Sequence, residues 1–214
     1  VLLTEGAFRA IEPRLDPSWL VLVADPAIVD GVTGFKFHRG CLALVHRPSR
    51  QLPRSAFARA RRLILLEAVG NPDNIGGIFR SAAALGAAGV LLDPTCADPF
   101  YRKAVRTSMG AVLRLPFATI DSWPQGLAAL GEMGFTIVAL APSAELTVDQ
   151  FAATLSGDAN VALLAGSEGS GLTAAALSAA HTAVRIPVDP RSDSLNVVVA
   201  VSIALQRILP KQFY

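Results

Sequence analysis

The feature that most constrains the fold is an apolar run that stops at a glycine-rich turn. Residues 161–165 read VALLA, which has the length of a buried strand, and residues 166–171 read GSEGSG. A strand followed by such a turn lets a ligand approach bare backbone closely. The glycine spacing matches neither the dinucleotide fingerprint nor the hydrolase elbow. The turn is therefore a candidate binding site of unspecified type, and an ordinary surface turn is the alternative.

A second apolar segment lies shortly after this turn. Residues 183–187 read AVRIP and lead into a loop that contains Asp189, Arg191 and Asp193. Ser194, Leu195 and Asn196 then open a helix that is apolar nearly all round. A helix of this kind must be buried, either in the core or against a partner chain.

From residue 63 onward, strand-length apolar runs alternate with helical stretches, which is typical of an α/β fold with a mainly parallel sheet and helices on both faces. The predicted strands are 63–69, 89–92, 113–117, 136–140, 161–165 and 183–186. The predicted helices are 75–86, 99–107, 123–133, 148–155, 173–180 and 195–209. Ligands in such sheets bind beyond the carboxyl ends of strands. Three such ends are candidates, at 140–142, 166 and 186–187.

The chain has 214 residues, of which 52% are hydrophobic and 17% charged. We expect a small α/β module at 1–57, with short strands at 19–24 and 41–45, one helical turn at 26–29 and a linker at 46–55. The main domain then covers 58–214. Because the first residue is Val, we expect the N-terminal module to be incomplete. No apolar run is long enough to span a bilayer and no secretory signal is visible, so we expect a soluble, cytoplasmic protein.

Basic residues are concentrated in two acid-free segments. Residues 36–62 contain eight Lys and Arg, and residues 100–120 contain four, although the net charge is only +2. This distribution favours a phosphate-binding surface, with a solvated face as the alternative. Cys41, Cys96 and the three histidines are scattered. We expect both cysteines to be small buried residues and no metal to bind.

Several motifs carry a resemblance to a known family. Asn74 is followed six positions later by Arg80 at the start of a helix; the strand at 161–165 runs into Gly166, Glu168, Gly169, Gly171 and Leu172; Ile186 and Pro187 precede Ser194, Leu195 and Asn196. Between them stands R-T-S-M-G-A at 106–111, followed by Pro116. Over residues 63–206 these motifs resemble the SpoU branch of the SPOUT superfamily of RNA methyltransferases.

The resemblance implies a fold, a cofactor and a partner. The fold would have a C-terminal trefoil knot whose loops hold S-adenosylmethionine. The N-terminal module would bind RNA, and two subunits would form a homodimer through the closing helix. The cofactor-binding residues would be Leu140, Ala141, Gly166, Glu168, Gly171, Ile186, Pro187, Ser194, Leu195 and Asn196.

The implied reaction is methylation of a ribose 2′-hydroxyl in ribosomal or transfer RNA. The resemblance assigns Arg80 the part of the base, yet a guanidinium is essentially always charged. We therefore expect Arg80 to clamp an RNA phosphate and polarise the hydroxyl. Asn74, Glu168, Ser194 and Asn196 would orient the nucleotide. The residues predicted to contact RNA are Arg59, Arg61, Arg62, Arg80, Arg102, Lys103 and Arg106.

Other interpretations remain at this stage. Asn74 and Ser194 could simply cap helices, Arg80 could pair with a surface acid, and Glu168 could be a solvated turn residue. A catalytically inactive RNA-binding protein could have the same fold. A nucleotide-binding regulator is the weaker possibility, because no Lys follows the glycines as a P-loop requires.

Overall fold

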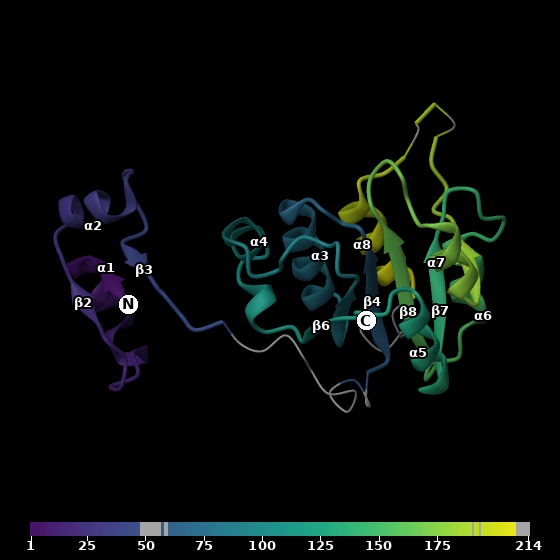
Figure 1. Ribbon diagram of the computed structural model, residues 1–214, viewed down its shortest axis with the longest axis horizontal. Helices are drawn as coiled ribbons and strands as arrows, with labels where there is room; N and C mark the ends of the chain where they lie inside the picture. The colour runs from purple at the N-terminus through teal and green to yellow at the C-terminus, as the bar shows by residue number, and fades with distance from the viewer. Residues whose placement is uncertain (48–56, 58–59, 190, 193, 209–214) are drawn as a thin grey trace. The chain divides into compact units, whose positions relative to one another are not determined.

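The chain forms two compact units, residues 1–48 and 49–214. A computed structural model describes residues 1–47, 57, 60–189, 191–192 and 194–208 (Figure 1). The predicted boundary lay at 57/58. Phe57 packs with the core of the second unit, against Gly89. Most of the predicted linker, from residue 48 onward, lies outside the described residues, as do Arg59 and Asp193.

The first unit is a three-stranded sheet with two helices. Its strands, β1 (Leu2–Leu3), β2 (Leu22–Val23) and β3 (Cys41–Leu42), are ordered β2-β1-β3, with β2 parallel and β3 antiparallel to β1. Its helices are α1 (Glu5–Ile11), followed by the 3₁₀ turn η1 (Glu12–Arg14), and α2 (Pro26–Thr33). Leu3 and Val29 are buried, whereas many of its other large apolar side chains are exposed.

This unit differs from the prediction in detail. The two predicted strands contain only two paired residues each, because both are outer strands against the short β1. The predicted helical turn at 26–29 continues to Thr33 and ends at Gly34. Helix α1 was not predicted, because its only apolar stripe, formed by Ala7, Phe8 and Ile11, is short and only partly buried. Thr4 caps its amino end through a hydrogen bond from the Ala7 N–H.

The second unit is built on a six-stranded sheet in which every pairing is parallel. The order is β6-β5-β4-β8-β7-β9. The strands are β4 (Arg62–Glu67), β5 (Gly89–Leu92), β6 (Phe117–Thr119), β7 (Phe135–Leu140), β8 (Asn160–Gly166) and β9 (Thr182–Val184). The central strands are almost continuously buried, as expected for a sheet covered on both faces.

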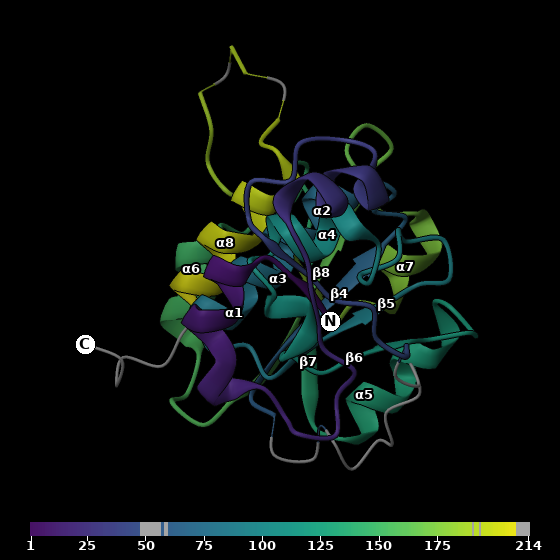
Figure 2. The same ribbon diagram turned by 90° about the vertical axis from the view of Figure 1, so that its left-hand side faces the viewer.

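Helices cover both faces of this sheet (Figures 1 and 2). Ile64 and Leu66 of β4 point into one core, which α3, α4, α6 and α8 share, and the alternate residues Leu63 and Leu65 point into the other, which α5 and α7 share. The helices are α3 (Pro72–Ala84), α4 (Arg102–Thr107), α5 (Ala128–Glu132), α6 (Val148–Thr154), α7 (Ala174–Ala179) and α8 (Val197–Arg207). The predicted α/β architecture is confirmed.

Two predicted elements of this unit are misplaced. The strand predicted at 113–117 begins only at Phe117, because Gly110 adopts a left-handed conformation (φ 78°) and residues Ala111–Leu113 form the 3₁₀ turn η3, which buries Val112. The helix predicted at 123–133 is shorter, since the 3₁₀ turn η4 (Gln125–Leu127) precedes α5. Apolar content alone did not distinguish these short turns from regular elements.

The cysteines also differ from expectation. Cys41 is exposed, so the prediction that both thiols are buried is wrong for this residue. Cys96 is half-buried, and its thiol donates to the Leu66 carbonyl (3.4 Å). Burial is the largest cause that raises the pKa of the Cys96 thiol to about 12.

Candidate active site

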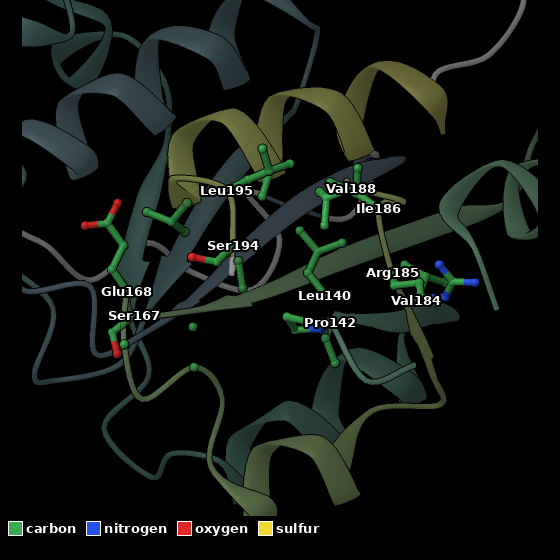
Figure 3. A pocket seen from close by; sticks show the side chains of 17 residues that line it. Leu140, Pro142, Ser167, Glu168, Val184, Arg185, Ile186, Val188, Ser194 and Leu195 are labelled. Atoms are coloured by element: carbon green, nitrogen blue, oxygen red, sulfur yellow. The ribbon is translucent and has the colours of Figure 1, made fainter. Parts of the chain in front are cut away.

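A pocket of about 440 Å³ lies beyond the carboxyl ends of β7, β8 and β9. These strands are neighbours in the sheet, so their ends open onto a common space. Its walls are mainly apolar, and Figure 3 shows Leu140, Ile186, Val188 and Leu195 around it, with Glu168 toward one end. The lining residues are Leu140, Ala141, Pro142, Ala165, Gly166, Ser167, Glu168, Gly169, Gly171, Val184, Arg185, Ile186, Val188, Ser194, Leu195, Val197 and Ala200.

The glycine turn after β8 folds back onto the strand it follows. The Gly171 N–H donates to the Ser167 carbonyl (3.1 Å). A Cβ at Gly166 would stand 2.4 Å from the backbone carbon and oxygen of Gly171, so a side chain there would displace the turn. Gly169 and Gly171 have φ values of 95° and 66°, which disfavour other residues. These glycines therefore shape one wall of the pocket.

Asn196 joins the three predicted motifs. Its Oδ1 accepts from the Val198 N–H (2.9 Å), which makes Asn196 the N-cap of α8. This bond fixes Nδ2 as the donor, and Nδ2 donates to Oδ1 of Asn74 (3.2 Å) and to a carboxylate oxygen of Glu168. Residues from α3, the glycine turn and the start of α8 therefore meet at one side-chain amide.

The helix-capping explanations for Asn74 and Ser194 are wrong. The N-cap of α3 is Asn71, whose side chain accepts from the Asp73 N–H. Asn74 lies in the first turn of that helix and is 7% exposed, with its carbonyl turned toward Asn196. Ser194 precedes the true N-cap of α8 and lines the pocket. Both side chains thus lie at or beside the pocket for reasons other than capping.

Arg80 is exposed on the same helix as Asn74. Six helical residues separate the two by about 9 Å along the axis and roughly 120° around it, so Arg80 does not join the Asn196 junction. Within the described part of the chain, the side chain of Arg80 forms no ion pair. The alternative that it pairs with a described surface acid is therefore not supported.

The predicted basic surface is correct only in part. Arg61, Arg102, Lys103 and Arg106 are exposed, and Lys103 lies 3.9 Å from the Asp73 carboxylate. Arg59 lies outside the described residues. Arg62 is 3% exposed, and its guanidinium donates to the backbone carbonyls of Ile208, Arg61 and Ala159. Burial, with a smaller effect of the Arg61 charge, lowers the pKa of Arg62. The prediction that Arg62 lies on an RNA-binding surface is therefore wrong.

Most predicted pocket residues line the pocket, but some lining residues were missed. Pro187 and Asn196 lie beside the pocket rather than in its lining. Ser167, Val184, Arg185, Val188 and Ala200 line it without having been predicted. Their positions in the sequence could have identified them, because each lies near the end of a predicted strand or one helical turn after Asn196. In the loop after Pro187, Arg191 forms a two-bond ion pair with Asp189 (2.8 and 3.0 Å), which lowers the pKa of that carboxyl.

A buried carboxylate, that of Glu67, binds the residue that follows the glycine turn by two positions. Glu67 ends β4, directly beside Gly166 of β8, and is buried. It accepts from the Thr173 N–H (2.8 Å), the Thr173 hydroxyl (2.9 Å) and the Trp123 indole N–H (2.8 Å). Thr173 is both the N-cap of α7 and the second residue after Gly171. Sequence analysis missed Glu67, because an acid at the end of an apolar strand has no distinctive pattern.

Comparison with known proteins identifies the family. Residues 61–206 match the model of the SpoU rRNA Methylase family. The chain belongs to this family. An uncharacterized tRNA/rRNA methyltransferase of Mycobacterium bovis is 40% identical over 181 residues, which cover 85% of this chain and 63% of that protein. A relative from Synechocystis with the same description is 34% identical, covering 76% of this chain and 58% of that protein. The chain thus spans less than two thirds of the length of these relatives.

Solved structures show the same fold. The SpoU methyltransferase AviRb from Streptomyces viridochromogenes, in complex with AdoMet, superposes with a TM-score of 0.83 at 23% identity, over 99% of this chain and 82% of that one. A structure described as an RNA 2′-O ribose methyltransferase has a TM-score of 0.70 at 26% identity, over 100% of this chain and 81% of that one. The SpoU architecture of the six-stranded unit is therefore established.

No group of three or more His, Cys, Asp or Glu side chains that could hold a metal ion occurs among the described residues. In the same residues, no helix is both long and apolar enough to cross a membrane.

Proposed function

We propose that the protein transfers a methyl group from S-adenosylmethionine to a ribose 2′-hydroxyl of transfer or ribosomal RNA. The observation that carries this proposal is the Asn196 junction, which brings Asn74 of the first motif to Glu168 on the wall of the pocket. Family membership and the descriptions of the similar proteins, one a 2′-O ribose methyltransferase, support it.

The pocket suits S-adenosylmethionine in size and chemistry. A volume of about 440 Å³ lies in the range of small-molecule sites. Leu140, Ile186 and Leu195 offer apolar contact to an adenine ring, while backbone groups at the strand ends offer hydrogen bonds. The absence of a side chain at Gly166 lets the glycine turn pack against β8, so that Gly171 can line the pocket, and Glu168 supplies negative charge for a cationic ligand. When bound, the cofactor supplies an electrophilic methyl group on a sulfonium.

The residues around the pocket divide the remaining tasks. Asn196 holds Asn74 and Glu168 in fixed positions, and the second carboxylate oxygen of Glu168 can accept a hydrogen bond from a ribose hydroxyl. Arg80 clamps an RNA phosphate and polarises the 2′-hydroxyl, because its permanent charge suits it to binding rather than to base catalysis. Positioning of this kind supplies a large share of the rate in group transfer.

The assembly that this function needs remains a proposal. The resemblance implies a trefoil knot in the path of the final segments, a homodimer through α8, and RNA binding by the first unit. Helix α8 supports the dimer, because Val199 is exposed on the face opposite the buried Val197 and Val201. A catalytically inactive RNA-binding protein is the alternative, and the intact junction argues against it.

The experiment combines labelled S-adenosylmethionine with RNA from cells that lack the gene, followed by nucleoside mass spectrometry. We expect one 2′-O-methylated nucleoside. A methyl group on a base would contradict the proposed specificity, and no transfer despite cofactor and RNA binding would favour the inactive alternative.

Variants of Arg80 test its role in the same assay. A planar fork binds phosphate through two bonds that Lys cannot reproduce. Arg80→Lys should therefore reduce kcat nearly as much as Arg80→Ala, by about 100-fold if roughly 3 kcal/mol of charge-assisted bonding is lost. Cofactor affinity by calorimetry should survive both changes. Near-normal turnover of the Lys variant would mean that a point charge suffices. Loss of cofactor binding in either variant would mean that Arg80 belongs to the cofactor site rather than to the RNA-binding site.

A further inference from the structure

The first unit contains a loop in which aromatic and basic residues alternate. Residues 34–40 read Gly-Phe-Lys-Phe-His-Arg-Gly. Gly34 ends helix α2 in a left-handed conformation (φ 76°), and Gly40 precedes β3 in a similar one (φ 66°). The five residues between these glycines connect α2 to β3 as one loop.

The loop is held in shape by the protein's own hydrogen bonds. Asp30 Oδ1 accepts from the Phe37 N–H (2.7 Å), and the Thr33 hydroxyl donates to the Phe35 carbonyl (2.9 Å). At the far end, the Thr4 N–H donates to the Gly40 carbonyl (2.8 Å). A loop that is ordered in advance loses less conformational entropy when a ligand binds.

Four of the five residues between the glycines are exposed, and the fifth, Phe37, is half-buried. Phe35 is 58% exposed, and its ring lies edge-on to that of Phe37, with ring centroids 6.0 Å apart. Lys36, His38 and Arg39 are exposed, and among the described residues neither Lys36 nor Arg39 forms an ion pair. The one acid that faces the loop from α2, Asp30, already binds the Phe37 N–H. The loop therefore presents an exposed aromatic ring beside two cations that form no ion pair with a described acid.

We infer that loop 34–40 binds an unpaired nucleotide of the RNA substrate, with Phe35 stacked on the base and Lys36 and Arg39 on the flanking phosphates. Base stacking on an exposed ring together with cations that contact the backbone is how proteins bind single-stranded RNA. A duplex cannot offer a free base face, so this site selects a loop, bulge or single strand. The inference rests on the proposed function, which supplies RNA as the substrate.

Binding of the full chain to a 12-nucleotide single-stranded RNA that contains 2-aminopurine tests this inference. Phe35→Ala should weaken binding by about 10- to 100-fold, the range for loss of one base stack, and should abolish the quenching of 2-aminopurine fluorescence. Phe35→Tyr should retain both. The matched control is Leu44→Ala, because Leu44 is 96% exposed but lies outside the loop.

The contribution of Lys36 and Arg39 can be measured separately, through the salt dependence of RNA affinity. The double variant Lys36→Gln/Arg39→Gln should lower the slope of log affinity against log salt by about 1.4, since each phosphate contact contributes about 0.7 for a single strand. The Phe35→Ala variant should keep the wild-type slope. A blunt duplex of the same sequence should bind more weakly than the single strand and respond little to Phe35→Ala.

The outcomes separate this inference from the proposed function. Unchanged affinity and quenching in Phe35→Ala, with normal methyl transfer by the wild type, would overturn the loop site and leave the methyltransferase intact. An equal loss in Leu44→Ala would indicate a general apolar interface instead and would also overturn it. A wild-type chain that binds S-adenosylmethionine but neither binds nor methylates RNA would overturn both.

Discussion

At the scale of single residues, Asn196 performs two tasks with the two ends of one amide. Its oxygen caps α8, and its nitrogen donates to Asn74 and Glu168. The cap explains why Asn suits this position structurally, but Asp and Ser would cap equally well. An ionised Asp has no hydrogen to donate and a Ser hydroxyl has one, whereas the Asn196 amide donates to both Asn74 and Glu168 while its oxygen caps the helix. The residue type is therefore accounted for by the junction rather than by the helix.

Asn196→Asp separates these two tasks. An Asp N-cap should preserve α8 and change the midpoint of thermal unfolding little, whereas loss of two donated bonds and repulsion from Glu168 should lower kcat/KM by about 10- to 100-fold. The matched control is Asn71→Asp, another N-cap whose side chain accepts from a backbone N–H, at Asp73. Similar kinetics in the two variants would show that the junction has no catalytic importance.

At the scale of elements, the sequence identified the long buried strands and missed what depends on tertiary context. Strands β4 and β8 are apolar between their end residues, as expected for a parallel sheet covered on both faces, and both were predicted within a few residues. Helix α3 begins three residues before the predicted start, because Asn71 caps it and Pro72 occupies its first turn. The burial of Arg62 could not be predicted from the local sequence. The carbonyls that its guanidinium binds belong to Ala159 and Ile208, which are distant in sequence.

A substitution on the exposed face of helix α8 tests the proposed dimer. Its buried face packs on α3, where Val198 lies against Gly77, so the face that carries Val199 (44% exposed) is free to meet a partner. Val199→Lys should convert a dimer to a monomer in sedimentation velocity, because a charge in the centre of an apolar interface is not compensated. Gly77 and the core are untouched, so far-UV circular dichroism should not change. A wild-type monomer at micromolar concentration would contradict the dimer directly.

At the scale of the whole molecule, the sequence alone does not distinguish an arginine on the surface from one that is buried and holds elements of the fold together. Adjacent arginines in one basic segment have opposite environments, since Arg61 is exposed and Arg62 is buried. The guanidinium of Arg62 satisfies the carbonyl of Ile208, the C-cap of α8, and the carbonyl of Ala159, which immediately precedes β8. It therefore joins β4, β8 and α8, and the last two of these elements also line the pocket.

The same substitution at these two neighbours distinguishes RNA binding from folding. Arg61→Met should lower the salt slope of RNA affinity by about 0.7 to 0.9, if its charge contacts one phosphate, and leave thermal stability unchanged. Arg62→Met should leave the slope of the folded protein unchanged. It should destabilise the fold by about 3 kcal/mol, because buried carbonyls lose a charged donor, and lower the unfolding midpoint by roughly 5–10 °C. Each variant is the control for the other. A flattened slope with an unchanged midpoint in Arg62→Met would mean that this guanidinium leaves its carbonyl partners to bind phosphate.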